Sequence, residues 1–206
     1  LSKTNSPLSK ADFYKYSSYN VDPIKLKLKN YILYNLPPPT QGIASLMIMG
    51  ILDKIRNKYE NDFTLIHSIV EATKIAFKIR DKYISDPRYM KIDEKKFLND
   101  EFLMRSAKKI NFDKASHWSK ENKKGDTVWL GSADRYGNVV SFIQSIYWEF
   151  GSGIFLPETG IILQNRGISF SLNKKHHNCL IPGRKPFHTI QPALAVFNDG
   201  KVMSFG

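Results

Sequence analysis

Residues 125–142 read GDTVWLGSADRYGNVVSF, and the character of the chain changes within this stretch. A charged, polar linker ends at Asp126, and an apolar run with β-type alternation follows Thr127. A threonine in this place commonly just opens a strand. If the chain is cut before Thr127, however, the residue gains an α-amine with a pKa of about 7.7–8.0, which can serve its hydroxyl as a general base. The triplet GDT alone favours the ordinary strand residue.

Downstream of Asp126 the sequence predicts short strands separated by turns. Residues 128–133 and 139–146 flank Arg135-Tyr136-Gly137-Asn138, which is typical of a hairpin. Further strands are expected at residues 161–163, 193–197 and 202–205, with a turn at Asn198-Asp199-Gly200.

Upstream of the same point, helical spacing dominates. Pro37, Pro38 and Pro39 end an irregular, tyrosine-rich region, and Thr40 is a candidate N-cap for a buried helix that starts near residue 43. A second helix, capped by Thr64, is expected to end near residues 86–87, and a third to run from about residue 94 to 108. Residues 111–126 show no period and should form an exposed, mobile segment. Helices that precede strands indicate an α+β protein, with helices packed on a largely antiparallel sheet.

Composition narrows the classes of function. The chain has 206 residues, is 42% hydrophobic and carries a net charge of +12, with 24 Lys/Arg against 15 Asp/Glu in residues 1–126. Scattered lysines without an aromatic-basic motif indicate solvated surfaces, although a basic nucleic-acid-binding module stays open as an alternative. The apolar stretch 43–52 is far shorter than the roughly 18–20 residues of a membrane span. No signal peptide is visible, which favours a cytoplasmic protein, but the chain starts at Leu1 rather than Met and leaves a lost leader open.

Neither a metal nor an organic cofactor is expected. Cys179 is the single cysteine, so an intrachain disulfide and CxxC motifs are excluded, and His176 and His177 beside it lack a second ligand pair. The sequence contains no P-loop, no dinucleotide glycine fingerprint and no G-x-S-x-G elbow.

Five separated blocks resemble the γ-glutamyltranspeptidase family of N-terminal nucleophile (Ntn) hydrolases. They occur in the family's order and span nearly the whole chain: LPPPTQGIASLMIMGIL at 36–52, Asp-Pro at 86–87, GDTVWLGSADRYGNVVSF at 125–142, FGSGIFLPETGIILQN at 150–165 and GRKPFHTIQPALAVFNDGKVM at 183–203.

The resemblance implies a proenzyme that cuts itself between Asp126 and Thr127, with Thr127 as the nucleophile. Residues 1–126 would be the C-terminal part of the large subunit and mainly helical, and residues 127–206 the N-terminal part of the small subunit and mainly β. The implied fold is a four-layer αββα sandwich, here incomplete, because the family's substrate-gripping arginine lies before Leu1 and its oxyanion-hole glycines after Gly206. The chain therefore resembles a central fragment of a longer proenzyme, and a non-catalytic relative stays open.

Several positions depart from the γ-glutamyl enzymes of the family. Val128 replaces a second threonine, and Arg166 and Ser169 replace a Gln and an Asp. The lost Asp would pair with a substrate α-ammonium, so γ-glutamyl transfer or glutathione hydrolysis is the less favoured alternative. The remaining changes are Ser145 for a Thr, Tyr147 for an Asn, and His188 and Thr189 for two serines.

The same departures resemble the oxamate amidohydrolases, a branch once grouped with cephalosporin acylases. A small carboxylate amide without an amino group would be the substrate, and the two processed subunits would associate with each other; no nucleic-acid or membrane partner is expected. Arg166 and His188 would hold the carboxylate while Thr127 attacks the amide carbon. Ser145 and Tyr147 would line the site beside Ser169 and Thr189, whereas Asp134, Asn138 and Glu149 have structural interpretations. A structural ion pair is the competing interpretation of Arg166.

Overall fold

Four antiparallel strands form the central sheet of the computed structural model, which describes residue 6, residues 8–118 and residues 127–206. The strand order is β1-β2-β7-β8. Their bounds are β1 (Ile24–Lys27), β2 (Tyr31–Asn35), β7 (Ala193–Phe197) and β8 (Val202–Phe205). In the middle of the sheet, Leu33 of β2 pairs with Ala195 of β7. The sheet therefore joins strands that lie on both sides of the predicted cleavage point.

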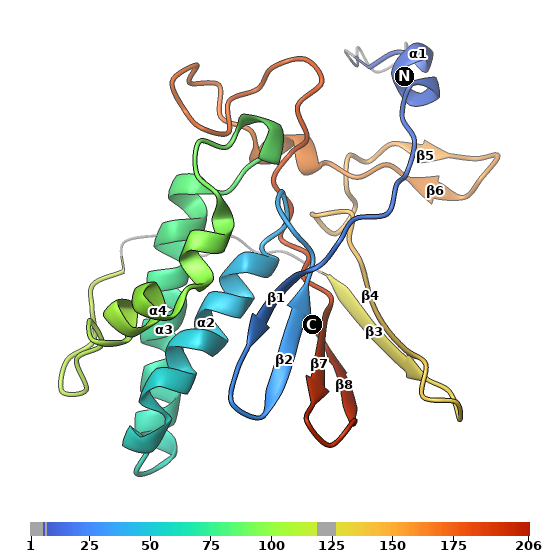
Figure 1. Cartoon of the computed structure of the whole chain (residues 1–206). Coiled ribbons are helices and arrows are strands. Elements are labelled where there is room, and N and C mark those ends of the chain that lie inside the picture. The colour runs from blue at the N-terminus through green and yellow to red at the C-terminus, as the bar shows by residue number, and fades with distance from the viewer. Residues whose placement is uncertain (1–5, 7, 119–126) are drawn as a thin grey trace.

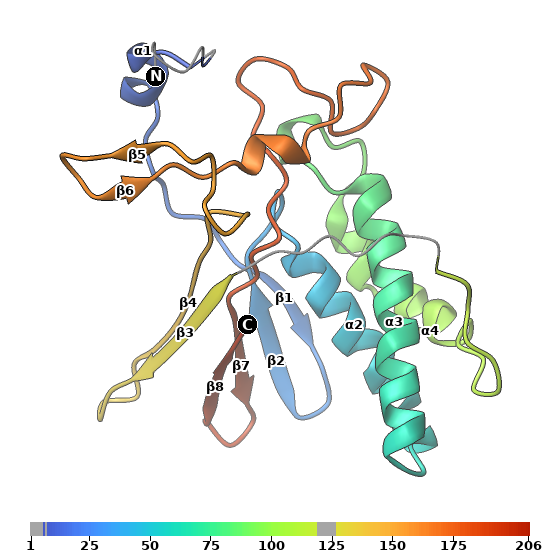
Figure 2. The same ribbon diagram turned by 180° about the vertical axis from the view of Figure 1, so that it is seen from behind.

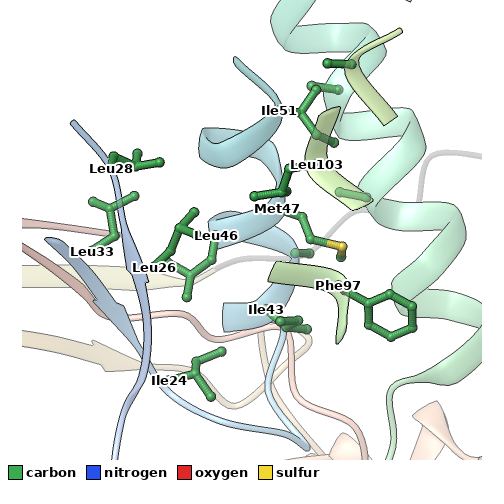
Figure 3. Packing of buried hydrophobic residues seen from close by; sticks show 14 of the residues in the cluster. Ile24, Leu26, Leu28, Leu33, Ile43, Leu46, Met47, Ile51, Phe97 and Leu103 are labelled. Atoms are coloured by element: carbon green, nitrogen blue, oxygen red, sulfur yellow. The ribbon is translucent and has the colours of Figure 1, made fainter. Parts of the chain in front are cut away.

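The main helices lie on one face of this sheet (Figures 1 and 2). They are α2 (Gly42–Ile55), α3 (Asp62–Tyr83) and α4 (Asp100–Ala107). The first of them, α2, packs against β1 and β2, and α3 and α4 pack on α2. Figure 3 shows both sides of α2, with Leu46 toward Leu26 of β1 and Met47 toward Leu103 of α4. Because α2 is covered on both sides, it is apolar nearly all round, as the sequence predicted.

A hairpin of β3 (Val128–Ala133) and β4 (Val139–Gln144) lies next to β8 (Figure 1). Two side-chain hydrogen bonds connect it to the sheet: Ser141 Oγ donates to the carbonyl of Phe205 (3.1 Å), and Ser204 Oγ donates to the carbonyl of Val140 (3.0 Å). The apolar side chains of Val128 and Leu130 stay more than half exposed. The α+β class is confirmed, and one helical layer on a sheet with this hairpin is an incomplete part of the expected sandwich.

The remaining helices and strands of the described residues are short. They are α1 (Lys10–Tyr14), β5 (Phe155–Leu156) paired with β6 (Ile161–Ile162), and the 3-10 helices η2 (Arg56–Lys58), η3 (Pro87–Tyr89), η4 (Glu94–Leu98) and η5 (Arg166–Ser169). None of the helices in these residues combines the length and apolarity that a membrane span requires.

The chain between α4 and residue 118 returns to α3. Glu71, which is only 4% exposed, accepts hydrogen bonds from the backbone N–H of Ser116 (3.2 Å) and from Ser116 Oγ (2.5 Å), and it pairs with Lys74 (2.6 Å). The expectation of an exposed segment holds for most of residues 111–118, whose course is fixed by this contact. Residues 119–126, the rest of the predicted mobile linker, lie outside the described residues.

The predicted starts of several helices were wrong, because neighbouring polar residues compete for the N-cap position. Gln41 occupies the N-cap position of α2, while Thr40 Oγ1 accepts from the N–H of Gly42 (3.2 Å) one residue earlier. Asn61 caps α3, with Thr64 as the reciprocal member of the capping box. The predicted third helix is two elements, because Asn99 accepts from the N–H of Phe102 and starts α4 anew.

The expected order of helices first and sheet second was wrong in part. β1 and β2 precede every helix of the helical layer and form half of the central sheet. The predicted strands at residues 193–197 and 202–205 are confirmed, whereas β4 ends at Gln144 rather than at residue 146.

Candidate functional site

The register of the β3–β4 hairpin brings Thr127 next to Ser145. Val128 pairs with Gln144, so the residues that flank this pair, Thr127 and Ser145, face each other at the open end of the hairpin. Their hydroxyl oxygens are 3.1 Å apart. Thr127 is exposed, as a cleavage position must be. Asp126, the other half of the predicted cleavage bond, lies outside the described residues.

Arg166 is the most buried positively charged side chain of the described part of the chain, with 1% exposure. It lies at the start of η5, where its guanidinium donates to Ser145 Oγ (3.0 Å) and to Thr189 Oγ1 (2.8 Å). Its Nε has no hydrogen-bond partner, and no carboxylate of the described residues forms an ion pair with it. Burial lowers the pKa of the guanidinium, which nevertheless stays charged at neutral pH. The structural ion pair considered above is therefore absent from these residues.

Tyr147 connects the hydroxyl pair to this cation. Its backbone N–H donates to Ser145 Oγ (3.1 Å), and its ring lies 4.4 Å from the Arg166 guanidinium. Tyr147 has a φ of 80°, in the left-handed region that a bulky residue rarely adopts. Such a conformation costs on the order of 1–3 kcal/mol and persists where the surroundings impose it, which is a common property of functional sites.

His188 reaches the same place from the loop before β7. Its N–H donates to the carbonyl of Pro39 (2.8 Å), which fixes the loop against the start of α2, while its Nδ1 has no partner. Burial, followed by the charge of Arg166, lowers the pKa of His188 to about 4. The imidazole is therefore neutral at pH 7 and offers a hydrogen bond rather than a charge.

Ser169 is set apart from this cluster. Its Oγ donates to the carbonyl of Phe187 (3.3 Å), and no hydrogen bond in the described residues links it to Thr127, Ser145 or Arg166. Because Phe187 directly precedes His188, this hydrogen bond connects Ser169 to the loop that carries His188. It supports the loop in this structure.

Two structural side chains were missed as parts of the site's support. Arg80 of α3 donates to Gln41 Oε1 (2.8 Å), and its guanidinium lies 5.7 Å from the ring of Phe187, next to His188. Burial lowers the pKa of Arg80 to about 10. Asp86 is fully buried and accepts from the backbone N–H of Lys185 (2.8 Å). In the sequence, Asp86-Pro87 is one of the blocks that resemble the family, and the fold shows that Asp86 holds the loop of His188.

The predicted structural roles of Asp134 and Asn138 agree with their contacts. Asp134 accepts from the N–H groups of Tyr136 and Asn138 (2.9 Å each) and closes the hairpin turn. Gly151 and Gly153 both have positive φ, a conformation that glycine adopts without a steric penalty. Among the described residues, no group of three His, Cys, Asp or Glu side chains is arranged to hold a metal ion.

Five residues thus form one connected group: Thr127, Ser145, Tyr147, Arg166 and Thr189. His188 precedes Thr189 in the chain and senses the charge of Arg166. Together they combine a hydroxyl that can act as a nucleophile, a second hydroxyl in contact with it, a buried cation and a neutral imidazole. Chemically, this set suits attack on a carbonyl group that carries a nearby negative charge.

Comparison with known proteins identifies the family of the chain. The gamma-glutamyltranspeptidase family matches residues 1–206. An oxamate amidohydrolase proenzyme of Klebsiella pneumoniae subsp. pneumoniae is 46% identical over 97% of this chain, and a glutathione hydrolase-like YwrD proenzyme of Bacillus subtilis is 34% identical over 98%.

Among solved structures, a cephalosporin acylase from Bacillus halodurans covers 100% of this chain with a TM-score of 0.88 and 36% sequence identity. The chain spans 38% of the length of each of these three proteins. A match over its whole length, together with two relatives above 30% identity, shows that the chain belongs to the gamma-glutamyltranspeptidase family.

Proposed function

We propose that the chain is the central part of a self-processing amidohydrolase, in which Thr127 hydrolyses the amide of a small carboxylate such as oxamate. The observation that carries this proposal is Arg166, a fully buried cation one hydroxyl away from Thr127 and without an anionic partner in the described residues. The effective cost of removing an ion from water in a protein is on the order of several kcal/mol, unless an opposite charge compensates it. A substrate carboxylate supplies that charge.

The neutral state of His188 supports a substrate with one negative charge. Arg166 supplies one positive charge, and the free Nδ1 of His188 supplies a hydrogen-bonding position beside it. A hydrogen bond to a neutral imidazole orients an amide or carboxylate without adding a second charge. Oxamate, a monoanion with an amide next to its carboxylate, matches this pair of groups.

The same cluster disfavours an amino-acid substrate. A γ-glutamyl group carries an α-ammonium, which needs a carboxylate or a set of acceptors. None of the side chains that contact Arg166 in the described residues is acidic, and Ser169 bonds to a backbone carbonyl. An ammonium placed beside Arg166 would be repelled.

Maturation would follow from the chemistry of Thr127. Its Oγ attacks the carbonyl carbon of Asp126, the C–N bond breaks, and the proton of the hydroxyl passes to the nitrogen, which becomes the α-amine. Water then hydrolyses the ester and releases the carboxyl group of Asp126. Residues 1–126 would belong to the large subunit and residues 127–206 to the small subunit, which remain associated.

In each turnover, the α-amine of Thr127 takes the hydroxyl proton as Oγ attacks the amide carbon. Ammonia leaves with that proton, and water hydrolyses the acyl ester to regenerate the threonine. Arg166 and His188 hold the carboxylate during both steps, Ser145 and Tyr147 line the position of the amide, and Thr189 holds Arg166.

Two measurements on the full-length precursor test the proposal. Intact mass should show two products split between Asp126 and Thr127 for the wild type and a single chain for Thr127→Ala. A wild-type precursor that stays whole would refute self-processing. With cleaved protein, ammonia release from oxamate should exceed release of p-nitroaniline from γ-glutamyl-p-nitroanilide; the reverse preference would assign the protein to the glutathione hydrolases.

A further inference from the structure

The residue before Arg166 contacts both peptide groups that flank Tyr147. The Asn165 backbone N–H donates to the carbonyl of Ile146 (3.2 Å), and Asn165 Oδ1 accepts from the N–H of Trp148 (3.2 Å). The φ and ψ of a residue describe how its two flanking peptide planes are turned relative to each other, so these two bonds restrain the backbone of Tyr147. We infer that Asn165 is a positioning residue, which holds Tyr147 in its left-handed conformation and thereby keeps the Tyr147 ring on Arg166.

A left-handed tyrosine needs such a restraint. At a φ of 80°, Tyr147 is in a region that a bulky residue leaves for ordinary torsion angles unless its surroundings prevent it. A change of φ and ψ between restrained neighbours would turn the Cα–Cβ bond. The ring would then move off the Arg166 guanidinium, which it now covers at 4.4 Å.

Asn165 is itself anchored by the folded loop around it. Its carbonyl accepts from the N–H of Ile168 (3.1 Å), which belongs to η5. Close by, the N–H of Ser152 donates to the carbonyl of Leu163 (2.8 Å), so the segments before and after β5 and β6 lie side by side. Gly151 permits this approach, because a Cβ at that position would collide with the Leu163 carbonyl oxygen. The two bonds to the neighbours of Tyr147 therefore start from a fixed backbone.

The position of the ring matters for the substrate carboxylate, and this step rests on the proposed function. An aromatic face attracts a guanidinium and helps to fix the plane in which its N–H groups point. Asn165 directly precedes Arg166, so one dipeptide carries both the cation and the residue that orients the ring over it. Asn165 thereby acts on carboxylate binding through Tyr147.

A double-mutant cycle between Asn165 and Tyr147 tests the inference in the mature full-length enzyme. The measured quantity is the ratio of kcat/KM for oxamate to kcat/KM for oxamide, an uncharged isostere, because only oxamate carries the carboxylate. Asn165→Ala should lower this ratio about 3- to 10-fold, in the range of one cation–π contact, and mainly through a higher KM for oxamate. In a Tyr147→Gly background, which lacks the ring, Asn165→Ala should leave the ratio unchanged.

Asn173 offers a matched control. Its side chain also accepts from a backbone N–H, that of Lys175 (2.9 Å), but at an exposed position. Asn173→Ala should therefore keep the wild-type ratio.

The thermal midpoint of the uncleaved Thr127→Ala precursor tests the backbone restraint without any substrate. Asn165→Ala should lower this midpoint by about 2–4 °C, because the strain at Tyr147 is then unopposed. Glycine adopts a φ of 80° freely, so the same change in a Tyr147→Gly chain should lower the midpoint much less. If Asn165→Ala does not fold, adding Tyr147→Gly should restore folding.

The outcomes are distinct. An Asn165→Ala effect of equal size in both backgrounds, on the ratio or on the thermal midpoint, would overturn the inference, as would a wild-type ratio in the Asn165→Ala enzyme. A double variant that stays as unfolded as the single variant would do the same. If the wild-type enzyme hydrolyses oxamate no faster than oxamide, the proposed function fails instead, and the thermal midpoints still decide whether Asn165 restrains Tyr147.

Discussion

At the scale of single residues, the charge of Arg166 should decide which amides are substrates. In the mature full-length enzyme, Arg166→Met should lower kcat/KM for oxamate about 10- to 100-fold more than for an uncharged amide of similar size, because only oxamate loses an ionic hydrogen bond. The ratio of the two values removes any effect on the nucleophile itself. Equal losses for both amides would show that Arg166 does not bind the carboxylate, and Arg135→Met is the control.

His188 should contribute a pH dependence to stability. Its folded pKa of about 4 lies below its ordinary value of 6.5, so between these values the unfolded chain binds more protons. Stability is therefore unaffected above pH 6.5 and falls as the pH drops toward 4, by up to about 3 kcal/mol from this residue. His188→Asn should flatten this part of a urea-denaturation profile in the uncleaved Thr127→Ala precursor.

Two other histidines control the His188 experiment. Burial also lowers the pKa of His177, so some loss of stability in the same pH range should remain in the variant. His117 is exposed, and His117→Asn should keep the wild-type profile. A His188→Asn profile that matches the wild type would contradict the half-buried, neutral state of this imidazole.

The sequence could predict parts of this site and not others. The contact of Thr127 with Ser145 follows from the hairpin, since its register is set by the turn near Gly137 and by the alternation of the strands. The burial of Arg166 has no local signal, because it depends on the distant loop that carries Thr189, and nothing in the residue types around Tyr147 predicts its positive φ. The helical spacing around Arg80 likewise gives no sign of its contacts with Gln41 and Phe187.

At the scale of elements, Asp86 should stabilise the connection between η3 and the loop that leads to His188. The carboxylate is fully buried and accepts from Arg88 and from the N–H of Lys185. Asp86→Asn should lower the free energy of unfolding by about 2–4 kcal/mol. The amide nitrogen of the new side chain would face a donor, Arg88 or the N–H of Lys185, and would leave buried groups unpaired. Urea denaturation of the Thr127→Ala precursor at pH 7 measures this loss.

The pH dependence of the Asp86 variant distinguishes charge from shape. Burial by itself raises the pKa of Asp86, but the hydrogen bonds of Arg88 and Lys185 outweigh it and leave the pKa below its ordinary value. The contribution of the charge is thus present above pH about 3.9 and is lost as the pH falls through the folded pKa. The difference between the variant and the wild type should shrink in acid, and Asp22→Asn, at an exposed position, should show none. A difference that stays constant with pH would contradict the role of the charge.

The elements themselves were predictable where the signal is local. β7 and β8 are joined by Asn198-Asp199-Gly200, so turn chemistry and alternation agree. β1 is short, and its exposed Lys25 and Lys27 alternate with two buried residues; its inner neighbour β2 pairs with β7, far away in the sequence. The alternation of β1 was a local signal that the interpretation of this region as irregular overlooked, which is why the expected order of elements was wrong.

At the scale of the whole molecule, the central sheet crosses the proposed cleavage point. β1 and β2 come before Asp126, and β7 and β8 come after Thr127. The two pieces share the β2–β7 pairing, in which residues Tyr31 to Tyr34 pair with Phe197 to Leu194, and they share the core that α2 forms with Leu33 and Ala195. Cutting one peptide bond at the end of the hairpin leaves these contacts in place.

The two subunits of the mature full-length protein should therefore stay together without a covalent link. They should elute as one species in size-exclusion chromatography and separate only in denaturant. Leu33→Asp places a charge in the middle of the pairing, at a side chain that is 1% exposed, and should make the cleaved subunits separate or precipitate. Lys27→Asp, at an exposed position of β1, should not. Wild-type subunits that elute apart after cleavage would contradict this prediction. The sheet contacts that span the cut would then be too weak to hold the subunits together.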